Sequence, residues 1–184
     1  MELKFPARRV KPPYEQLAQE QEKSLYLTCL HLTGDPQDAQ DCAQEALLKG
    51  WRHYASFRGD AQPATWLHRI AVNVCMDLMR KRRKNASLEQ LQEDGFEPAD
   101  RGAEVYLALD EKERRALLRQ GLERLSPDAR AVVALRDLEG RSIQETAELL
   151  SLPEGTVKSR LTRARRQLCS FFSAQRELFE DLSV

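Results

Sequence analysis

The sequence predicts an all-α protein with two small helical domains joined by a flexible acidic linker. Apolar residues recur at steps of three and four over 14–84 and again over 103–179, which is the spacing of one helix face. The stretch between them lacks this spacing and contains Gly95 and Pro98. We therefore expect the following segments: a flexible N-terminal arm (1–13), a helical domain (14–84), a linker (85–102), a second helical domain (103–179) and a tail (180–184).

The charges are balanced overall but separated along the chain. The 184 residues include 29 Lys and Arg and 29 Asp and Glu, so net charge does not indicate a nucleic-acid partner. However, residues 80–84 are all basic, and 89–104 holds six acidic residues and one Arg. Two basic segments separated by an acidic one suggest two binding modules. Because the chain has no long apolar run and no signal-peptide pattern at its start, we expect a cytoplasmic protein without membrane insertion.

Nothing in the sequence indicates catalysis or a bound metal. Cys29, Cys42, Cys75 and Cys169 occur singly, without Cys-x-x-Cys spacing, so we expect reduced, buried thiols. The three histidines have no matching ligand or nucleophile partners, and no phosphate-binding loop is present. We therefore expect no enzyme activity, no metal and no cofactor.

Three helices are expected in the first domain. The first covers 14–32, with an apolar face, and ends near Gly34. Asp35 and Pro36 supply an N-cap and a first-turn proline for a second helix that runs to Tyr54. The Gly, Asp and Pro content of 57–63 predicts a loop, and a third helix begins near Pro63 or Ala64 and continues to about Lys84.

The third helix has two contrasting faces. Trp66, Leu67 and Val74 lie on its apolar face, where Trp66 is expected in the core, as is Trp51 of the second helix. A polar row lies on another face and runs into the basic segment; its members are Arg69, Asn73, Asp77, Arg80 and Lys84. Such a row suits hydrogen bonding to DNA, and the alternative is a solvated face with internal ion pairs.

Residues 142–168 predict a helix-turn-helix. Ser142 and Glu145 have the spacing of a capping box, and Pro153 and Gly155 interrupt the first helix. The second helix, 156–168, carries five basic residues and no acidic one, and its apolar residues fall on one face.

Helical projection assigns roles to the polar residues of that second helix. Ser159, Thr162, Arg163 and Arg166 lie farthest from the apolar face, where they would meet base edges in a major groove. Lys158, Arg160 and Arg165 lie on its flanks, where they would meet phosphates. The alternative is a basic surface helix that is merely solvated.

Three segments in this order resemble the extracytoplasmic-function (ECF) group of bacterial sigma factors in the sigma-70 family. They are DAQDCAQEALLKGWRHYASFRG (38–59), TWLHRIAVNVCMDLMRKRRK (65–84) and LSPDARAVVALRDLEGRSIQETAELLSLPEGTVKSRLTRARRQL (125–168). The resemblance implies a sigma region 2 helical bundle followed by a sigma region 4 helix-turn-helix. It also implies a non-catalytic bacterial subunit that joins core RNA polymerase, recognises promoters and promotes DNA melting.

The resemblance also implies where the partners bind. The helix matching 38–54 would dock on the clamp of the largest polymerase subunit through Asp41, Gln44, Glu45, Leu48 and Trp51. The minus-ten element would lie against the polar row of the third helix and a base-capturing loop formed by Gly59, Asp60, Ala61 and Gln62. The 156–168 helix would read the minus-thirty-five element, and the acidic linker would thread toward polymerase channels that normally hold nucleic acid.

The chain departs from the family pattern at two places. Gln62-Pro63-Ala64 stands where the family commonly has an aromatic residue, and Asp77 stands where an amide is more typical. An anti-sigma factor is a further partner that the resemblance makes possible. A free-standing helix-turn-helix regulator that acts without polymerase remains the alternative function.

Overall fold

The computed structural model describes residues 11–59, 61–86 and 111–181. Every regular element within these ranges is helical, as the sequence predicts. The chain divides into two compact units, Met1–Cys75 and Met76–Val184, and the division falls inside the third helix. Asp60, most of the expected linker, and the segment 103–110 of the expected second domain lie outside the described residues.

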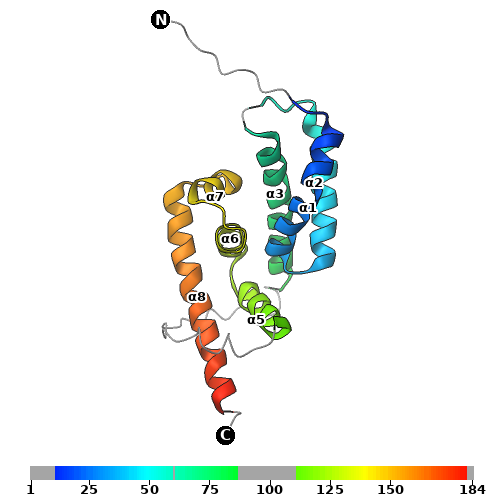
Figure 1. Cartoon of the computed structure of the whole chain (residues 1–184). Coiled ribbons are helices and arrows are strands. Elements are labelled where there is room, and N and C mark those ends of the chain that lie inside the picture. Colours follow the sequence, from blue (N-terminus) through cyan, green and yellow to red (C-terminus); the bar gives the residue numbers. More distant parts are fainter. Residues whose placement is uncertain (1–10, 60, 87–110, 182–184) are drawn as a thin grey trace, which may run out of the picture. The chain divides into compact units, whose positions relative to one another are not determined.

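Two helices and the first half of a third belong to the first unit (Figure 1). They are α1 (Tyr14–Thr33), α2 (Pro36–Tyr54) and α3 (Pro63–Ala86), with bounds close to those predicted. Gly34 ends α1 in the left-handed conformation with φ 72°, which glycine adopts without steric cost. Asp35 then caps α2, its side chain accepting from the backbone N–H groups of Gln37 and Asp38.

Buried thiols lie where the three helices of this unit meet. Cys29, Cys42 and Cys75 come from α1, α2 and α3 respectively, and all are buried and reduced. Hydrogen bonds with the other two thiols, together with burial, raise the pKa of Cys75. This thiol is therefore an inert packing group, as expected. Cys169 differs from the prediction, because it lies on the exposed side of its helix.

A buried histidine also joins α1 to α3. The ring of His68 lies 3.3 Å from Ser24 Oγ through Nε2 and 3.3 Å from Thr28 Oγ1 through Nδ1. The sequence offers no partner near His68, since these hydroxyls lie 44 and 40 residues away along the chain. Their role here is to satisfy a buried ring at a helix interface.

Gly50 allows α2 to approach its neighbours closely. A Cβ atom at this position would lie 2.6 Å from Tyr14 Oη and 2.7 Å from Leu67 Cδ1. Neither contact is compatible with a methyl group. The absence of a side chain at Gly50 therefore permits this close approach of α2 to Tyr14 of α1 and Leu67 of α3.

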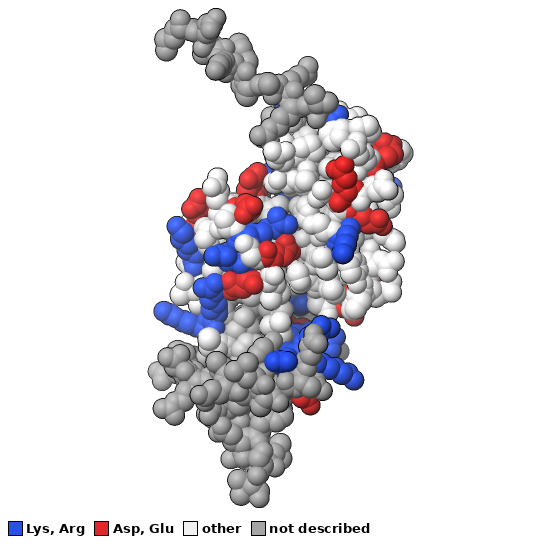
Figure 2. All heavy atoms as spheres, in the orientation of Figure 1, with Lys and Arg blue, Asp and Glu red and all other residues white. Residues whose placement is uncertain are grey.

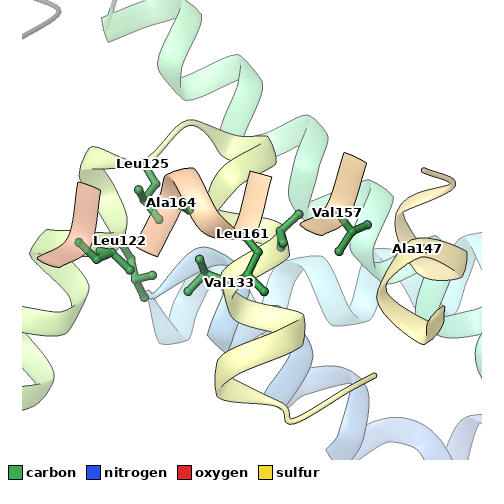
Figure 3. Close-up of a cluster of buried hydrophobic side chains, with 9 residues drawn as sticks. Leu122, Leu125, Val133, Ala147, Val157, Leu161 and Ala164 are labelled. Carbon is green, nitrogen blue, oxygen red and sulfur yellow. The ribbon is translucent and has the colours of Figure 1, made fainter. Parts of the chain in front are cut away.

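The second unit packs its helices around α8. They are α5 (Glu111–Arg124), α6 (Pro127–Val133), the π-helical segment η1 (Ala134–Leu138), α7 (Ile143–Leu150) and α8 (Glu154–Asp181). Helices α5, α6 and α7 all contact α8. Their shared core contains Leu122, Val133, Ala147, Val157, Leu161 and Ala164, drawn in Figure 3. Burying one such aliphatic side chain contributes about 1.5 to 3 kcal/mol, so this core fixes the orientation of α8.

Candidate nucleic-acid and polymerase interfaces

The predicted helix-turn-helix is formed by α7 and α8. Ser142 Oγ accepts from the Glu145 backbone N–H at 3.1 Å, and Glu145 Oε2 accepts from the Ser142 backbone N–H at 2.8 Å. This reciprocal pair confirms the capping box. The turn begins at Ser151, which is left-handed with φ 54°, and α8 starts at Glu154. Gly155 thus lies inside the first turn of α8, and the helix extends past the predicted end at 168.

The apolar and polar faces of α8 fall where the projection places them. Val157, Leu161, Ala164 and Leu168 are all buried. Lys158, Ser159, Thr162, Arg163, Arg165 and Arg166 are exposed, and Arg160 is half-buried. The polar face is consequently free of the core and available to a ligand.

Three of the four residues expected to read bases form hydrogen bonds to the backbone of their own helix. Ser159 Oγ donates to the Thr156 carbonyl at 3.1 Å and Thr162 Oγ1 donates to the Lys158 carbonyl at 3.0 Å. Arg163 Nε donates to the Ser159 carbonyl at 3.3 Å. A hydroxyl that donates in this way keeps its lone pairs outward, so it can still accept from a base edge.

The residues expected to meet phosphates have acidic partners instead. Arg165 forms two bonds to Asp137, from Nη2 at 2.6 Å and from Nε at 3.0 Å. Arg160 Nη1 lies 3.4 Å from Asp128, and Lys158 Nζ lies 3.7 Å from Glu154. Figure 2 shows acidic side chains interspersed with the Lys and Arg side chains over this unit. The hydrogen bonds that Arg165 donates to Asp137 raise the pKa of Arg165, which remains charged.

The polar row of α3 lies on the surface as predicted. Asn73, Asp77, Arg80 and Lys84 are exposed, and Arg69 is half-buried. The basic run Arg80–Lys84 is exposed throughout and continues the helix. Leu67 and Val74, on the other face, are buried.

An aromatic cluster holds the loop that precedes α3. The ring centroids of Tyr54 and Phe57 are 6.1 Å apart and nearly parallel, and Trp66 lies 5.8 Å from Tyr54 and 5.0 Å from Phe57. Trp66 is therefore part of this half-buried cluster. Gly59 and Gln62 are exposed and Ala61 is half-buried, and Gly59 has φ 83°, which favours glycine.

Residues at the end of the expected N-terminal arm anchor to the same cluster. The Lys11 ammonium lies 4.0 Å from the centre of the Tyr54 ring and donates to the Tyr54 carbonyl. Tyr54 Oη donates to the Pro12 carbonyl at 2.6 Å. Lys11 and Pro12 of the expected arm thus contact the first unit, and 1–10 lie outside the described residues.

Comparison with known proteins gives the family. Residues 17–85 match the family Sigma-70 region 2, and residues 115–168 match Sigma-70, region 4. The chain is 39% identical over 155 residues to the ECF RNA polymerase sigma factor SigM of Mycobacterium tuberculosis, a match covering 84% of this chain and 74% of SigM. The chain belongs to the ECF sigma factors. It is also 36% identical over 138 residues to the ECF RNA polymerase sigma-E factor of Escherichia coli, covering 71% of this chain and 72% of that protein.

Solved structures agree with the fold of this ECF sigma factor. The sigma factor RpoE of Bartonella quintana, solved in complex with the anti-sigma factor NepR, superposes with a TM-score of 0.61 at 26% identity. That match covers 87% of this chain and 96% of RpoE. CnrH, solved with the cytosolic domain of CnrY, has a TM-score of 0.62 at 24% identity, covers 88% of each chain and supports the fold alone.

The predicted polymerase-binding face of α2 is an exposed surface with apolar and acidic residues. Asp41, Gln44 and Glu45 are exposed. Leu48 is 56% exposed and Trp51 is 63% exposed, which makes the prediction of Trp51 as a core residue wrong. Gly50 lies on the buried side of α2, and the indole of Trp51, the next residue, lies on the exposed side. Exposed large apolar side chains side by side are typical of a docking surface.

Two further observations concern membranes and metal ions. No helix among the described residues is long and apolar enough to cross a membrane. Within the same ranges, His, Cys, Asp and Glu form no group that could hold a metal ion.

The sequence does not predict the carboxylates that pair with the α8 cations. Asp128 and Asp137 lie on other helices, and the position of those helices against α8 is set by tertiary packing.

Proposed function

We propose that this ECF sigma factor is a non-catalytic promoter-specificity subunit of bacterial RNA polymerase that acts in the cytoplasm. The observation that carries the proposal is the polar face of α8, which presents five basic residues with the apolar face fully buried. Membership in the sigma-70 family supports the polymerase as partner and does not favour a free-standing regulator.

In the second unit, α8 enters the major groove at the minus-thirty-five element. Ser159, Thr162, Arg163 and Arg166 face base edges, and a guanidinium can bond to O6 and N7 of guanine through two parallel hydrogen bonds. Lys158, Arg160 and Arg165 face the phosphates on the flanks. This placement of α8 is supported by the position of these polar residues on the side of the helix that faces away from the core.

The polar row of α3 binds the melted minus-ten element. Asn73 and Asp77 contact bases beside the loop 59–62, and Arg69, Arg80 and Lys84 contact the backbone. The aromatic contact between Phe57, which precedes that loop, and Trp66, which follows it, joins the two ends of the loop. Capturing a flipped base offsets the few kcal/mol that its unstacking costs, so melting requires no nucleotide hydrolysis by this subunit.

The exposed face of α2 binds the clamp of the largest polymerase subunit. Leu48 and Trp51 provide the apolar contact, and Asp41, Gln44 and Glu45 provide polar contacts around it. An aromatic anchor surrounded by polar residues is a common composition for an interface. An anti-sigma factor is a further proposed partner, supported by the RpoE–NepR complex.

Reconstitution with core polymerase tests the proposal. The full-length protein is mixed with core enzyme and a bacterial promoter library, and transcript start sites are sequenced. We expect starts that depend on the protein and share two upstream elements. A protein that neither binds core enzyme nor changes the start sites, but binds a duplex operator unaided, would instead be a free-standing regulator.

A further inference from the structure

The cations of α8 divide into two sets according to their neighbours. The flank cations Lys158, Arg160 and Arg165 each lie within ion-pair distance of an acidic side chain. Arg163 and Arg166, which point farthest from the core, have no carboxylate within that distance among the residues that the structure describes. The acidic side chains thus neutralise the positions that would meet phosphates and leave the outermost positions charged.

The pair between Asp137 and Arg165 has the strongest geometry of the three. Its two hydrogen bonds, 2.6 and 3.0 Å long, use the Nε and Nη2 edge of the guanidinium. Bidentate Arg–carboxylate pairs are stronger than single contacts, and the same planar fork is what binds a phosphate bidentately. Asp137 therefore occupies the donors that a DNA backbone would use.

Asp137 is placed for this contact by an irregular segment. It belongs to η1, where the backbone N–H of Glu139 donates to the Ala134 carbonyl at 3.0 Å, one residue farther than in an α-helix. Single π-helical turns occur frequently at functional sites. The side chain of Asp137 is 28% exposed and that of Arg165 is 54% exposed, so the pair lies at the surface where DNA would approach.

Phosphate contacts supply most of the affinity for DNA of any sequence, whereas base contacts distinguish one sequence from another. A carboxylate that competes with phosphate for a cation therefore weakens non-specific binding more than specific binding. The structure leads us to propose that Asp137 is a specificity-determining residue: it competes with DNA phosphates for Arg165 and so suppresses non-specific duplex binding by α8. This inference rests on the proposed function of α8.

The test compares the full-length protein with Asp137→Asn, which keeps the shape of the side chain and removes its charge. Binding to random-sequence duplex DNA is measured by fluorescence anisotropy from 50 to 200 mM salt. One additional phosphate contact steepens the slope of log K against log salt by about 0.9, which is roughly a 3.5-fold larger loss of affinity over this range. We expect D137N to bind more tightly at 50 mM salt and to show this steeper slope.

Two matched variants isolate the cause. Glu123→Gln removes one negative charge from an exposed position on α5, so it controls for net charge alone. In the double variant D137N/R165A the gain should disappear, because Arg165 is the group released. An equal gain in E123Q, or a gain that survives in the double variant, would overturn the proposal. Unchanged or weaker binding by D137N would overturn it as well. If the unfolding temperature of D137N is also lowered, the pair serves folding instead.

A separate measurement keeps this inference distinct from the proposed function. Arg163→Ala is assayed in holoenzyme on promoters with intact and altered upstream elements. If R163A loses upstream-element preference while D137N leaves non-specific binding unchanged, only the role of Asp137 fails. If R163A has no effect on that preference, the placement of α8 on the minus-thirty-five element fails.

Discussion

At the scale of single residues, position on a helix decides what each polar side chain can contact. Arg163 and Arg165 are two residues apart and chemically identical, but Arg163 lies on the outermost face and Arg165 is held by Asp137. The sequence separates them through helical projection, since apolar residues identify the buried face. It does not identify the carboxylate on another helix.

Arg163→Ala is expected to weaken recognition of the minus-thirty-five element. If the guanidinium pairs with a base, the variant loses about 1 to 3 kcal/mol of binding free energy and its preference at one position of the element. Holoenzyme binding to a set of single-base promoter variants measures both effects. Equal weakening on every variant would assign Arg163 to phosphate contact.

Trp51→Ala is expected to reduce affinity for core polymerase without destabilising the fold. Because the indole is 63% exposed, its removal leaves no core cavity. A buried interface tryptophan typically contributes 2 kcal/mol or more, which is roughly a 30-fold change in Kd. Titration of labelled protein with core enzyme gives the affinity, and thermal unfolding gives the stability.

Leu27→Ala is the matched control for this prediction. Leu27 is also a large exposed apolar residue, 41% exposed, but it lies on α1. Its truncation should leave core binding unchanged. If both variants bind core enzyme as the wild type does, the face of α2 is not the docking surface.

At the scale of helices, caps and periodicity could be read from the sequence. The Asp35 cap, the Gly34 terminus and the Ser142 capping box use short-range chemistry in which both partners lie within a few residues. The turn is less readable, because Ser151 adopts a left-handed conformation that glycine usually occupies. The π-helical η1 likewise has no local signal in the sequence. The prediction of a buried Trp51 is wrong because this residue borders the apolar face of α2, where the spacing of apolar residues does not decide which side chains are buried.

Ser142→Ala is expected to destabilise the second unit by about 1 kcal/mol through loss of the N-cap of α7. The hydrogen bonds from Ser142 lower the pKa of Glu145 below its usual value of 4.5. A depressed carboxyl pKa contributes stability that is present above the unfolded pKa and is lost as pH falls through the folded value. Denaturant unfolding at pH 7 and at progressively lower pH below 4.5 should therefore show the difference between the wild type and S142A shrinking in acid. A constant difference across that range would exclude Glu145 as a contributor.

At the scale of the whole molecule, the two units divide one task. In the function proposed above, α8 reads duplex DNA, whereas α3 and the loop before it meet single-stranded DNA. If that proposal holds, the two activities act together only when polymerase holds both promoter elements at once. Variants in the two units should consequently fail at different steps of initiation.

Asn73→Ala separates these steps. Asn73 is exposed on α3, the helix that follows the loop 59–62, and its amide can bond to an unpaired base that is inaccessible in duplex DNA. We expect N73A holoenzyme to form closed complexes with near-normal affinity but to open the promoter about 10-fold less, since one lost base contact corresponds to about 1.4 kcal/mol. Mobility shift at low temperature measures the first step and permanganate reactivity of unpaired thymines measures the second. Normal permanganate reactivity would exclude Asn73 from melting, whereas a matched loss in both assays would place it in initial binding.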